Sequence, residues 1–174
     1  MTSGSRRLFL AGLVVAVAWS APAARAENAQ PAAVTTHPAS AAQLVDAYLA
    51  AWNAHDAAKA GSFFAADGVY YDASTGTPQK GREAAQKNVI ESFMKAAPDL
   101  VWKRDGDAIV GKDAVAFEWT FSGTNTGDWG DGTKATGKKF SFKGATVIRF
   151  SGDKFAFEGD YYDALGFFKQ LGLM

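Results

Sequence analysis

The sequence has no cysteine, and His37 and His55 are the only histidines among its 174 residues. The absence of cysteine excludes disulfide bonds, thiolate metal sites and cysteine nucleophiles, so a hydrophobic core has to stabilise the fold. Because zinc sites without cysteine depend mainly on histidine, two histidines far apart in the chain make a zinc site a poor reading of this sequence. We therefore expect no metal ligands.

A hydrophobic run long enough to cross a membrane is also missing from the N-terminal region. The apolar stretch Leu8–Trp19 is shorter than the roughly 18 residues of a membrane span. It follows the basic pair Arg6-Arg7 and precedes a small-x-small ending, Ala24-Arg25-Ala26, which is the layout of a secretory signal over residues 1–26. A retained anchor helix is the alternative. "SRRLFLAG" resembles a twin-arginine export signal, and an ordinary signal fits as well, so both routes stay open. Either route predicts a periplasmic or secreted protein.

No excess of positive charge is present either. The chain has 18 basic and 18 acidic side chains, and removal of residues 1–26 takes three arginines and no acid, which leaves a net charge of −3. Nucleic-acid binders carry a basic face, so we expect no nucleic-acid partner, and no membrane partner once the signal is removed.

Residues 27–39 are rich in alanine, proline and threonine and predict a flexible leader before a single domain, residues 40–174. A capping box at Ser40 and Gln43 predicts the first helix, and further helices are expected after Asp56 and over residues 82–97. Apolar alternation then predicts strands over 69–72, 100–110, 114–124, 138–150 and 155–162, before a helix from the N-cap Asp163 to Leu171. This order predicts an α+β fold in which helices cover one face of an antiparallel sheet.

The loop "SGTNTGDWGDGTKATGKKF", residues 122–140, is the most unusual stretch of the chain. Its Gly137-Lys138 lacks the hydroxyl residue and the helix of a phosphate-binding loop, and Asp128 and Asp131 lack the spacing of a calcium loop. It is longer than an ordinary hairpin connection, and long loops on a rigid sheet often border binding sites. We expect Trp129 to lie at the rim of a pocket. The alternative is a loop without a role.

Carboxylates are the candidate acid–base groups. Asp72 ends "GVYYD" and Asp163 ends "GDYYD", and the tyrosines beside each predict partial burial, which raises a carboxylate pKa towards a catalytically useful value. For Asp163 the competing reading, favoured here, is the N-cap of the last helix; for Asp72 it is a turn residue. In the last strand Phe155, Phe157, Gly159 and Tyr161 alternate with Ala156, Glu158, Asp160 and Tyr162.

Residues 41–174 resemble a SnoaL-like polyketide cyclase domain of the nuclear transport factor 2-like superfamily. The resemblance rests on "LVDAYLAAWNAHDAAKAGSFFAADGVYYD", the "GTNTG…TGKK" block and the closing "DALGFFKQLG". It implies a cone-shaped, curved antiparallel sheet, that is, a cystatin-like α+β barrel packed by about three N-terminal helices and a short C-terminal helix. It also implies a pocket, a homodimer and no cofactor.

The resemblance also implies site residues. Asp72 matches the base of ketosteroid isomerase, a member of the same superfamily, and Tyr48 lies on the helix that carries its oxyanion tyrosine. The chain departs from the cyclases at two places. Asn125 replaces the histidine of their "GTHTG" block, and Ala145 and Thr146 stand on the strand that carries their catalytic aspartate. An asparagine still donates a hydrogen bond but cannot titrate.

Three functions follow from these residues. In the first, an isomerase, cyclase or hydrolase uses Asp72 as base and Asn125 and Tyr48 to hold an oxyanion. In the second, the same pocket only binds a small apolar or aromatic molecule. Under both, the pocket residues are Trp52, Tyr71, Trp119, Trp129, Tyr161 and Asp163. In the third, the exposed sheet face binds a partner through Glu118, Lys139, Lys143 and Glu158.

Overall fold

A computed structural model describes residues 38–174 of the chain. The expected signal and most of the expected leader therefore lie outside the described residues. The first helix, α1, covers Pro38–Asn53 and so begins two residues before the predicted capping box. Every other element follows from there in the predicted order, with one short strand added.

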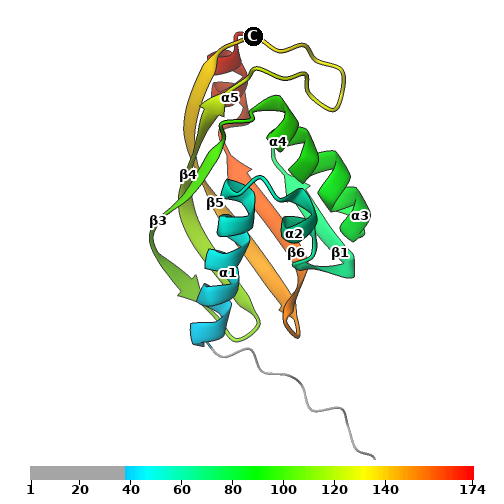
Figure 1. Ribbon diagram of the computed structural model, residues 1–174. Helices are drawn as coiled ribbons and strands as arrows, with labels where there is room; N and C mark the ends of the chain where they lie inside the picture. Colours follow the sequence, from blue (N-terminus) through cyan, green and yellow to red (C-terminus); the bar gives the residue numbers. More distant parts are fainter. Residues whose placement is uncertain (1–37) are drawn as a thin grey trace, which may run out of the picture. The chain divides into compact units, whose positions relative to one another are not determined.

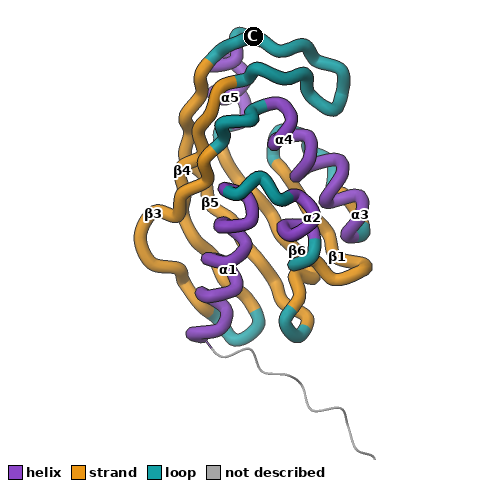
Figure 2. The backbone as a smooth tube through the Cα atoms, viewed as in Figure 1, coloured by secondary structure: helices purple, strands orange, loops and turns teal. Residues whose placement is uncertain are grey.

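Six strands form one curved, open sheet in the order β2-β1-β6-β5-β4-β3 (Figures 1 and 2). Neighbouring strands are antiparallel except β1 and β6, which run parallel. The predicted α+β fold is confirmed, and the parallel pair is a local departure from an all-antiparallel sheet. The two-residue β2 is too short to leave a periodic signal in the sequence. The strands are β1 Phe64–Asp72, β2 Gln79–Lys80, β3 Val101–Val110, β4 Ala114–Thr124, β5 Lys139–Ser151 and β6 Lys154–Tyr162.

The helices α1, α2 and α3–α4 cover one face of this sheet (Figure 1). Asp56 caps α2 through a 2.8 Å bond from the Lys59 backbone nitrogen, as predicted, and Gly172 ends α5 in the left-handed conformation. Between α3 and α4 the helix makes one π turn. None of the helices in the described part is long and apolar enough to cross a bilayer. The helices are α2 Ala57–Gly61, α3 Arg82–Ala85, the π turn η1 Gln86–Ile90, α4 Glu91–Ala96 and α5 Ala164–Leu171.

A bulge in β6 reverses which of its residues face the helices. Phe155 pairs with Phe150 of β5 and Phe157 pairs with Arg149, so Ala156 has no partner and the alternation shifts by one residue. As a result Glu158 and Asp160 are buried beneath the helices, whereas Tyr161 is 47% exposed. The expectation that Glu158 projects from the exposed face of the sheet is wrong for this reason.

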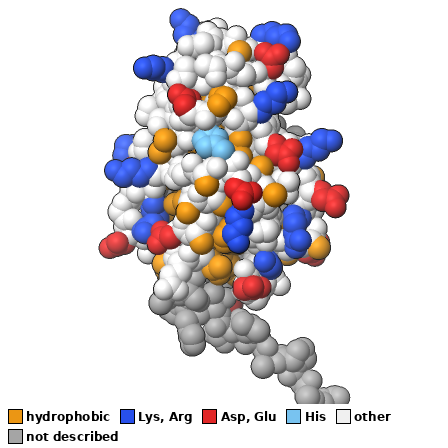
Figure 3. Space-filling model, in the orientation of Figure 1, with side chains coloured by type: hydrophobic (Ala, Val, Ile, Leu, Met, Phe, Trp, Pro, Cys, Tyr) orange, Lys and Arg blue, Asp and Glu red, His pale blue; other side chains and the backbone are white. Residues whose placement is uncertain are grey.

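The face of the domain drawn in Figure 3 mixes basic, acidic and apolar side chains. No broad area of a single charge appears on this face. The polar chemistry of interest lies inside the domain instead, among the aromatic residues of the core.

Candidate functional site

A small cavity lies between the helices and the concave face of the sheet. Eight aromatic rings, two of them tyrosines, form most of its wall, and two carboxyl groups form the remainder. About 20 Å³ of the space between these side chains can be reached by the centre of a water molecule. That is room for about one ordered water. We call this space the inner cavity; its lining residues are Trp52, Tyr70, Asp72, Phe93, Trp102, Trp119, Phe121, Phe142, Asp160 and Tyr162.

Asp72 ends β1 and lies in the wall of the inner cavity, with 3% of its surface exposed. Its carboxylate accepts hydrogen bonds from the backbone nitrogens of Ser74 (2.9 Å) and Thr75 (3.3 Å) and from the Ser74 hydroxyl. The Tyr162 hydroxyl lies 3.1 Å from each carboxylate oxygen and donates to them. Asp72 is therefore both the turn residue and the cavity residue that the sequence offered as alternatives. Burial raises its pKa, and the bonds from Ser74, Tyr162 and Thr75 act in the opposite direction.

Asp160 on β6 is the second carboxyl group of the inner cavity and is 4% exposed. The Tyr70 hydroxyl donates to one of its oxygens at 2.6 Å and the Thr146 hydroxyl to the other at 2.5 Å. Thr146 in turn accepts a 2.7 Å bond from the indole nitrogen of Trp119, which leaves its own hydroxyl hydrogen free for Asp160. Burial, and next the charge of Asp72, raise the pKa of Asp160 to about 7.

The two carboxyl groups come together because β1 and β6 are neighbours. Asp72 and Asp160 are partners in the parallel register, so their side chains leave the sheet on the same face. Two carboxylates that share one buried site cannot easily both be ionised, which separates their titrations. Asp72 accepts more hydrogen bonds than Asp160, which favours its charged form and makes it the candidate base of the pair. Asp160, with a pKa of about 7, exchanges a proton near neutral pH.

A third carboxyl group, Glu158, lies deeper and belongs to no hydrogen bond among the described residues. The hydroxyl of Tyr48 is buried near Glu158 and also makes no hydrogen bond of ordinary geometry. Burial, and next the charge of Asp160, raise the pKa of Glu158 well above its usual range, whereas the Tyr48 hydroxyl acts on the carboxyl group so as to lower that pKa. Tyr48 contacts Trp52, Phe63, Phe64, Trp102 and Phe155 edge to face, and so it is a core residue outside the inner cavity.

A larger groove opens beside the inner cavity, between α3–α4, α5 and the long loop. About 670 Å³ of it can be reached by the centre of a water molecule. Trp129 lines this groove, in agreement with its predicted place at a rim. We call this space the outer groove; its lining residues are Ser74, Thr75, Gln79, Lys87, Asn88, Glu91, Ser92, Phe93, Lys95, Trp129, Gly130, Asp131, Thr133, Phe167, Phe168, Leu171 and Leu173.

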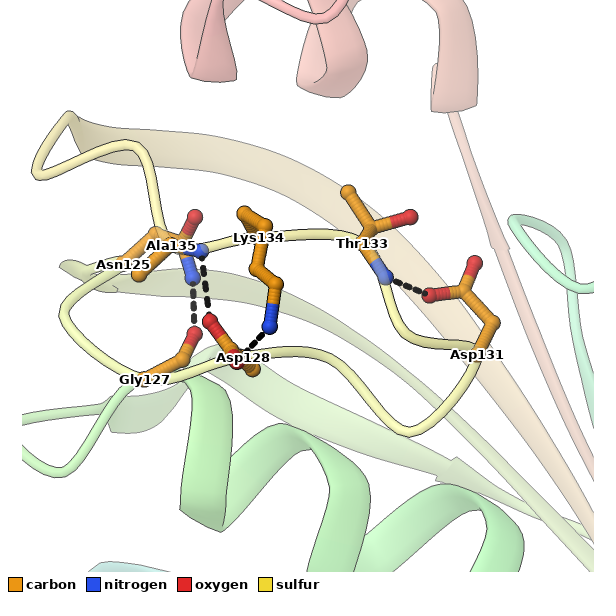
Figure 4. Close-up of polar contacts among 7 residues, drawn as sticks. All are labelled: Asn125, Gly127, Asp128, Asp131, Thr133, Lys134 and Ala135. Carbon is orange, nitrogen blue, oxygen red and sulfur yellow. Dashed lines mark hydrogen bonds and ion pairs between the residues drawn. The ribbon is translucent and has the colours of Figure 1, made fainter.

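Hydrogen bonds within the loop give it a fixed shape (Figure 4). The Asp128 carboxylate accepts a hydrogen bond from the backbone nitrogen of Ala135 (3.0 Å) and forms an ion pair with Lys134 (2.8 Å). The Asp131 carboxylate accepts a hydrogen bond from the backbone nitrogen of Thr133 (2.9 Å). Both aspartates are thus used to shape the loop. No group of three or more His, Cys, Asp or Glu residues among residues 38–174 is placed to hold a metal ion.

Asn125 is fully buried at the base of the loop and does not line the inner cavity. Its amide nitrogen donates to the carbonyl oxygens of Ala96 (3.1 Å) and Gly127 (2.8 Å). Its amide oxygen accepts from the backbone nitrogen (2.9 Å) and the hydroxyl (3.1 Å) of Thr136. The side chain therefore has no donor left for an oxyanion, and the structure gives it the role of joining the loop to the end of α4.

The remaining predicted residues divide between the cavity and other places. Trp52 and Trp119 line the inner cavity, as expected. Tyr71 and Tyr161 pack against each other, with centroids 5.7 Å apart, and line neither space, because the β6 bulge turns Tyr161 outward. Asp163 caps α5 through a 2.8 Å bond from the Gly166 nitrogen, which is the reading the sequence favoured.

Sequence reasoning missed Asp160 and the four residues whose hydroxyl groups donate to the carboxyl pair, Tyr70, Ser74, Thr146 and Tyr162. In "GDYYD" it selected the closing aspartate, whereas the opening one, Asp160, faces the cavity. Thr146 stands directly opposite Asp160 on β5. The only available signal was the spacing of Asp160 and Tyr162, two residues apart in one strand and so on one face. Tyr70 and Ser74 lie two residues before and two residues after Asp72.

A family model described as SnoaL-like polyketide cyclase matches residues 42–171. A comparison with curated proteins found no match. TsrD from Streptomyces laurentii is 28% identical with a TM-score of 0.67, over 79% of this chain and 98% of that chain. A protein with a ketosteroid isomerase-like fold from Catenulispora acidiphila, solved in complex with trimethylamine, is 26% identical with a TM-score of 0.62, over 75% and 92%.

A third structure shows the shared fold alone. IdmH from Streptomyces antibioticus, a candidate polyketide cyclase, has 22% identity and a TM-score of 0.61, over 75% of this chain and 96% of that chain.

Proposed function

The chain belongs to the SnoaL-like polyketide cyclase family, and from that premise we propose that it is a cofactor-independent acid–base enzyme. Its substrate is a small apolar or aromatic molecule that carries a carbonyl group. The reaction is removal of a proton from the carbon beside that carbonyl, the step that isomerases and aldol cyclases share.

The observation that carries this proposal is the carboxyl pair in the aromatic cavity. Asp72 and Asp160 leave adjacent strands on one face, and both pKa values are raised by burial. General acid–base catalysis is most efficient when the pKa of the group lies near the working pH. The eight aromatic rings around the pair supply the apolar surface that a flat substrate requires.

In the proposed reaction the Asp72 carboxylate takes the proton from carbon and becomes a carboxylic acid. The electron pair of the broken C–H bond moves to the carbonyl oxygen, which becomes an enolate. Asp160, in its protonated form, donates a hydrogen bond to the enolate oxygen or transfers its proton there. Tyr162 and Ser74 hold Asp72 in place, and Tyr70 and Thr146 hold Asp160.

Asp160 lies next to the position at which the resemblance places the catalytic aspartate of the cyclases, which this chain lacks. The resemblance places that aspartate on the strand where the chain has Ala145 and Thr146. Thr146 pairs directly with Asp160 and donates a hydrogen bond to its carboxyl group. A carboxyl group from the neighbouring strand thus takes up a place beside the missing one, which supports acid–base chemistry at this site.

The test is proton exchange at carbon. Acetophenone and 2-tetralone are incubated with the protein in D2O, and loss of the signal of the protons beside the carbonyl is followed by NMR. The proposal predicts exchange above the rate in buffer, at least about 100-fold slower with Asp72→Asn, because general base catalysis contributes 10²–10⁴-fold. Asp153→Asn, in the exposed β5–β6 turn, is the matched control and should exchange at the wild-type rate.

Exchange that is equal in wild type, Asp72→Asn and buffer contradicts an acid–base enzyme for these substrates. Exchange that is lost in Asp72→Asn and kept in Asp160→Asn confirms Asp72 as the base and removes Asp160 from the proposed reaction. Folding of each variant is checked by circular dichroism before the rates are compared.

A second candidate is a binding protein for small alkylammonium cations. Aromatic rings with carboxylates among them attract such cations through the faces of the rings and through charge. The inner cavity has both features, the adjoining outer groove has the room that the inner cavity lacks, and the relative from Catenulispora acidiphila was solved with trimethylamine. Calorimetric titration with tetramethylammonium and with tert-butanol, a neutral molecule of similar shape, tests this function. A cation-binding function predicts that tetramethylammonium binds and that tert-butanol does not.

Export and a homodimer remain predictions from the sequence. Residues 1–26 lie outside the described part of the chain, and the experiment for export is fractionation of the native host with detection of the mature protein in the periplasm or medium. Sedimentation of the purified protein measures its oligomeric state.

A further inference from the structure

The inner cavity and the outer groove are adjacent and have one lining residue in common, Phe93 of α4. The inner cavity accepts about one water, whereas ligand pockets usually hold 300 Å³ or more. A substrate with an aromatic ring therefore needs more room than the inner cavity offers alone. The nearest room is the outer groove, on the other side of the Phe93 ring.

Phe93 is held by aromatic contacts from both sides. Its ring lies edge to face with Phe121 of the inner cavity, at 5.7 Å, and with Trp129 of the outer groove, at 5.2 Å. The side chain is 7% exposed. Such contacts stabilise the position of Phe93, so a bound ring that replaced them would compensate for moving Phe93.

Trp129 is brought to Phe93 by the loop. The Gly127 nitrogen donates to the Ala96 carbonyl oxygen (3.0 Å), and the Gly130 nitrogen donates to the Ser92 hydroxyl (3.1 Å), so the loop is bound to α4 on both sides of Trp129. The indole nitrogen of Trp129 is buried and has no hydrogen-bond partner among the described residues. A buried donor without a partner at the wall of a groove is a group that a ligand oxygen would satisfy.

The second link between the two spaces is Ser74. It lines the outer groove, and both its backbone nitrogen and its hydroxyl donate to Asp72 in the inner cavity. A ligand in the outer groove thus contacts a residue that holds the proposed base. Phe93 and Ser74 are the points at which the groove meets the inner cavity.

The walls of the outer groove differ in chemistry. The side formed by the loop and α5 is largely apolar, with Trp129, Phe167, Phe168, Leu171 and Leu173. The side formed by β2 and the α3–α4 helix is polar, with Gln79, Lys87, Asn88, Glu91, Ser92 and Lys95. A flat molecule with one apolar face and oxygen substituents along one edge complements these walls.

We infer that Phe93 selects for substrate length by separating the inner cavity from the outer groove, and that the part of a substrate distal to its reacting carbonyl binds in the outer groove. This inference rests on the proposed function for the reacting end of the molecule. The reacting carbonyl lies in the inner cavity beside Asp72, and the remaining rings lie on Trp129 and Phe168.

The test compares two ketones that differ by one ring, acetophenone and 4-acetylbiphenyl, by isothermal titration calorimetry. Phe93→Ala removes the separating ring, and Phe168→Ala removes a ring of equal size from the outer groove only. The measured quantity is the affinity for 4-acetylbiphenyl divided by the affinity for acetophenone. We expect it to rise about tenfold in Phe93→Ala and to fall about tenfold in Phe168→Ala, since burial of about half a ring changes binding by about that factor. Phe93→Leu should shift the ratio in the same direction as Phe93→Ala, by less.

A ratio that is unchanged in both variants, or that moves in the same direction in both, overturns the inference. So does the absence of binding of 4-acetylbiphenyl to wild type and to Phe93→Leu. Calorimetry detects binding without chemistry, so its outcome is independent of proton exchange. If the ratios shift as expected while no ketone exchanges its protons, the length selection stands and the proposed reaction fails.

Discussion

Replacement of Asp160 by asparagine should change how the stability of the protein depends on pH. Asp160 is fully buried, and its pKa is about 7 in the folded protein against 3.8 for the free side chain. Asparagine has the shape of the protonated acid: its amide oxygen accepts a hydrogen bond from one of the two hydroxyls that donate to Asp160, and its amide nitrogen donates, as the protonated oxygen of the acid does. The variant therefore resembles the wild type at low pH and differs from it at high pH.

The size of the effect follows from the shift. Because the pKa is raised on folding, the folded protein binds this proton more tightly than the unfolded chain does. That stabilisation is complete below about pH 4 and is lost as the pH rises through 7. A shift of about three pKa units corresponds to about 4 kcal/mol at 1.36 kcal/mol per unit. The variant lacks this loss, so it should be more stable than wild type by up to about 4 kcal/mol at pH 8 and about equal to it at pH 4.

The assay is urea unfolding followed by tryptophan fluorescence at each pH from 4 to 8, with Asp153→Asn as the control in an exposed turn. The difference in unfolding free energy between Asp160→Asn and wild type should increase steadily with pH, whereas that of the control should stay flat. A difference that is constant over this range, or that falls as the pH rises, refutes the assignment of a raised pKa to Asp160.

Three further predictions concern buried or tightly packed positions. Glu158→Met removes two buried oxygens that make no hydrogen bond, and it should raise the unfolding free energy by about 1–3 kcal/mol at pH 8. The gain should be smaller at pH 4, because the raised pKa of Glu158 penalises only its ionised form. An equal gain at both pH values would contradict this. Asn125→Ala deletes four side-chain hydrogen bonds and should cost about 2–4 kcal/mol in urea unfolding, whereas no measurable loss would show that the loop does not depend on this residue. A Cβ at Gly127 would lie 2.0 Å from the Lys95 carbonyl oxygen, so Gly127→Ala should displace the loop and speed hydrogen exchange in residues 125–138; unchanged exchange there would refute the close packing.

Local signals in the sequence were enough to predict most elements of the fold. Asp56 and Asp163 cap helices as predicted, because an N-cap depends on a side chain and backbone nitrogens only two or three residues away. Strand alternation placed Trp119 on the inward face of β4, and helical spacing placed Trp52 on the inward face of α1. Both line the inner cavity.

The carboxyl pair could not be predicted from the sequence, because it depends on contacts between distant residues. Asp72 and Asp160 are 88 positions apart and meet only through the parallel pairing of β1 and β6. The bulge at Ala156 then determines which residues of β6 face inward, and no residue type marks it in the sequence. Asn125 shows the converse. Its place in the family pattern suggested an oxyanion donor, but the four hydrogen bonds that saturate its amide appear only once the loop is folded onto α4.

The most direct test of the acid–base account is the titration of the two carboxyl groups themselves. The 13C chemical shifts of the aspartate side-chain carboxyl carbons, recorded from pH 3 to pH 9 and assigned with Asp72→Asn and Asp160→Asn, give the two midpoints. The account predicts a midpoint of about 7 for Asp160, a midpoint for Asp72 above its usual range, and a shift of each titration when the other carboxylate is removed. Independent titration of both groups near the ordinary value of about 4 would contradict it.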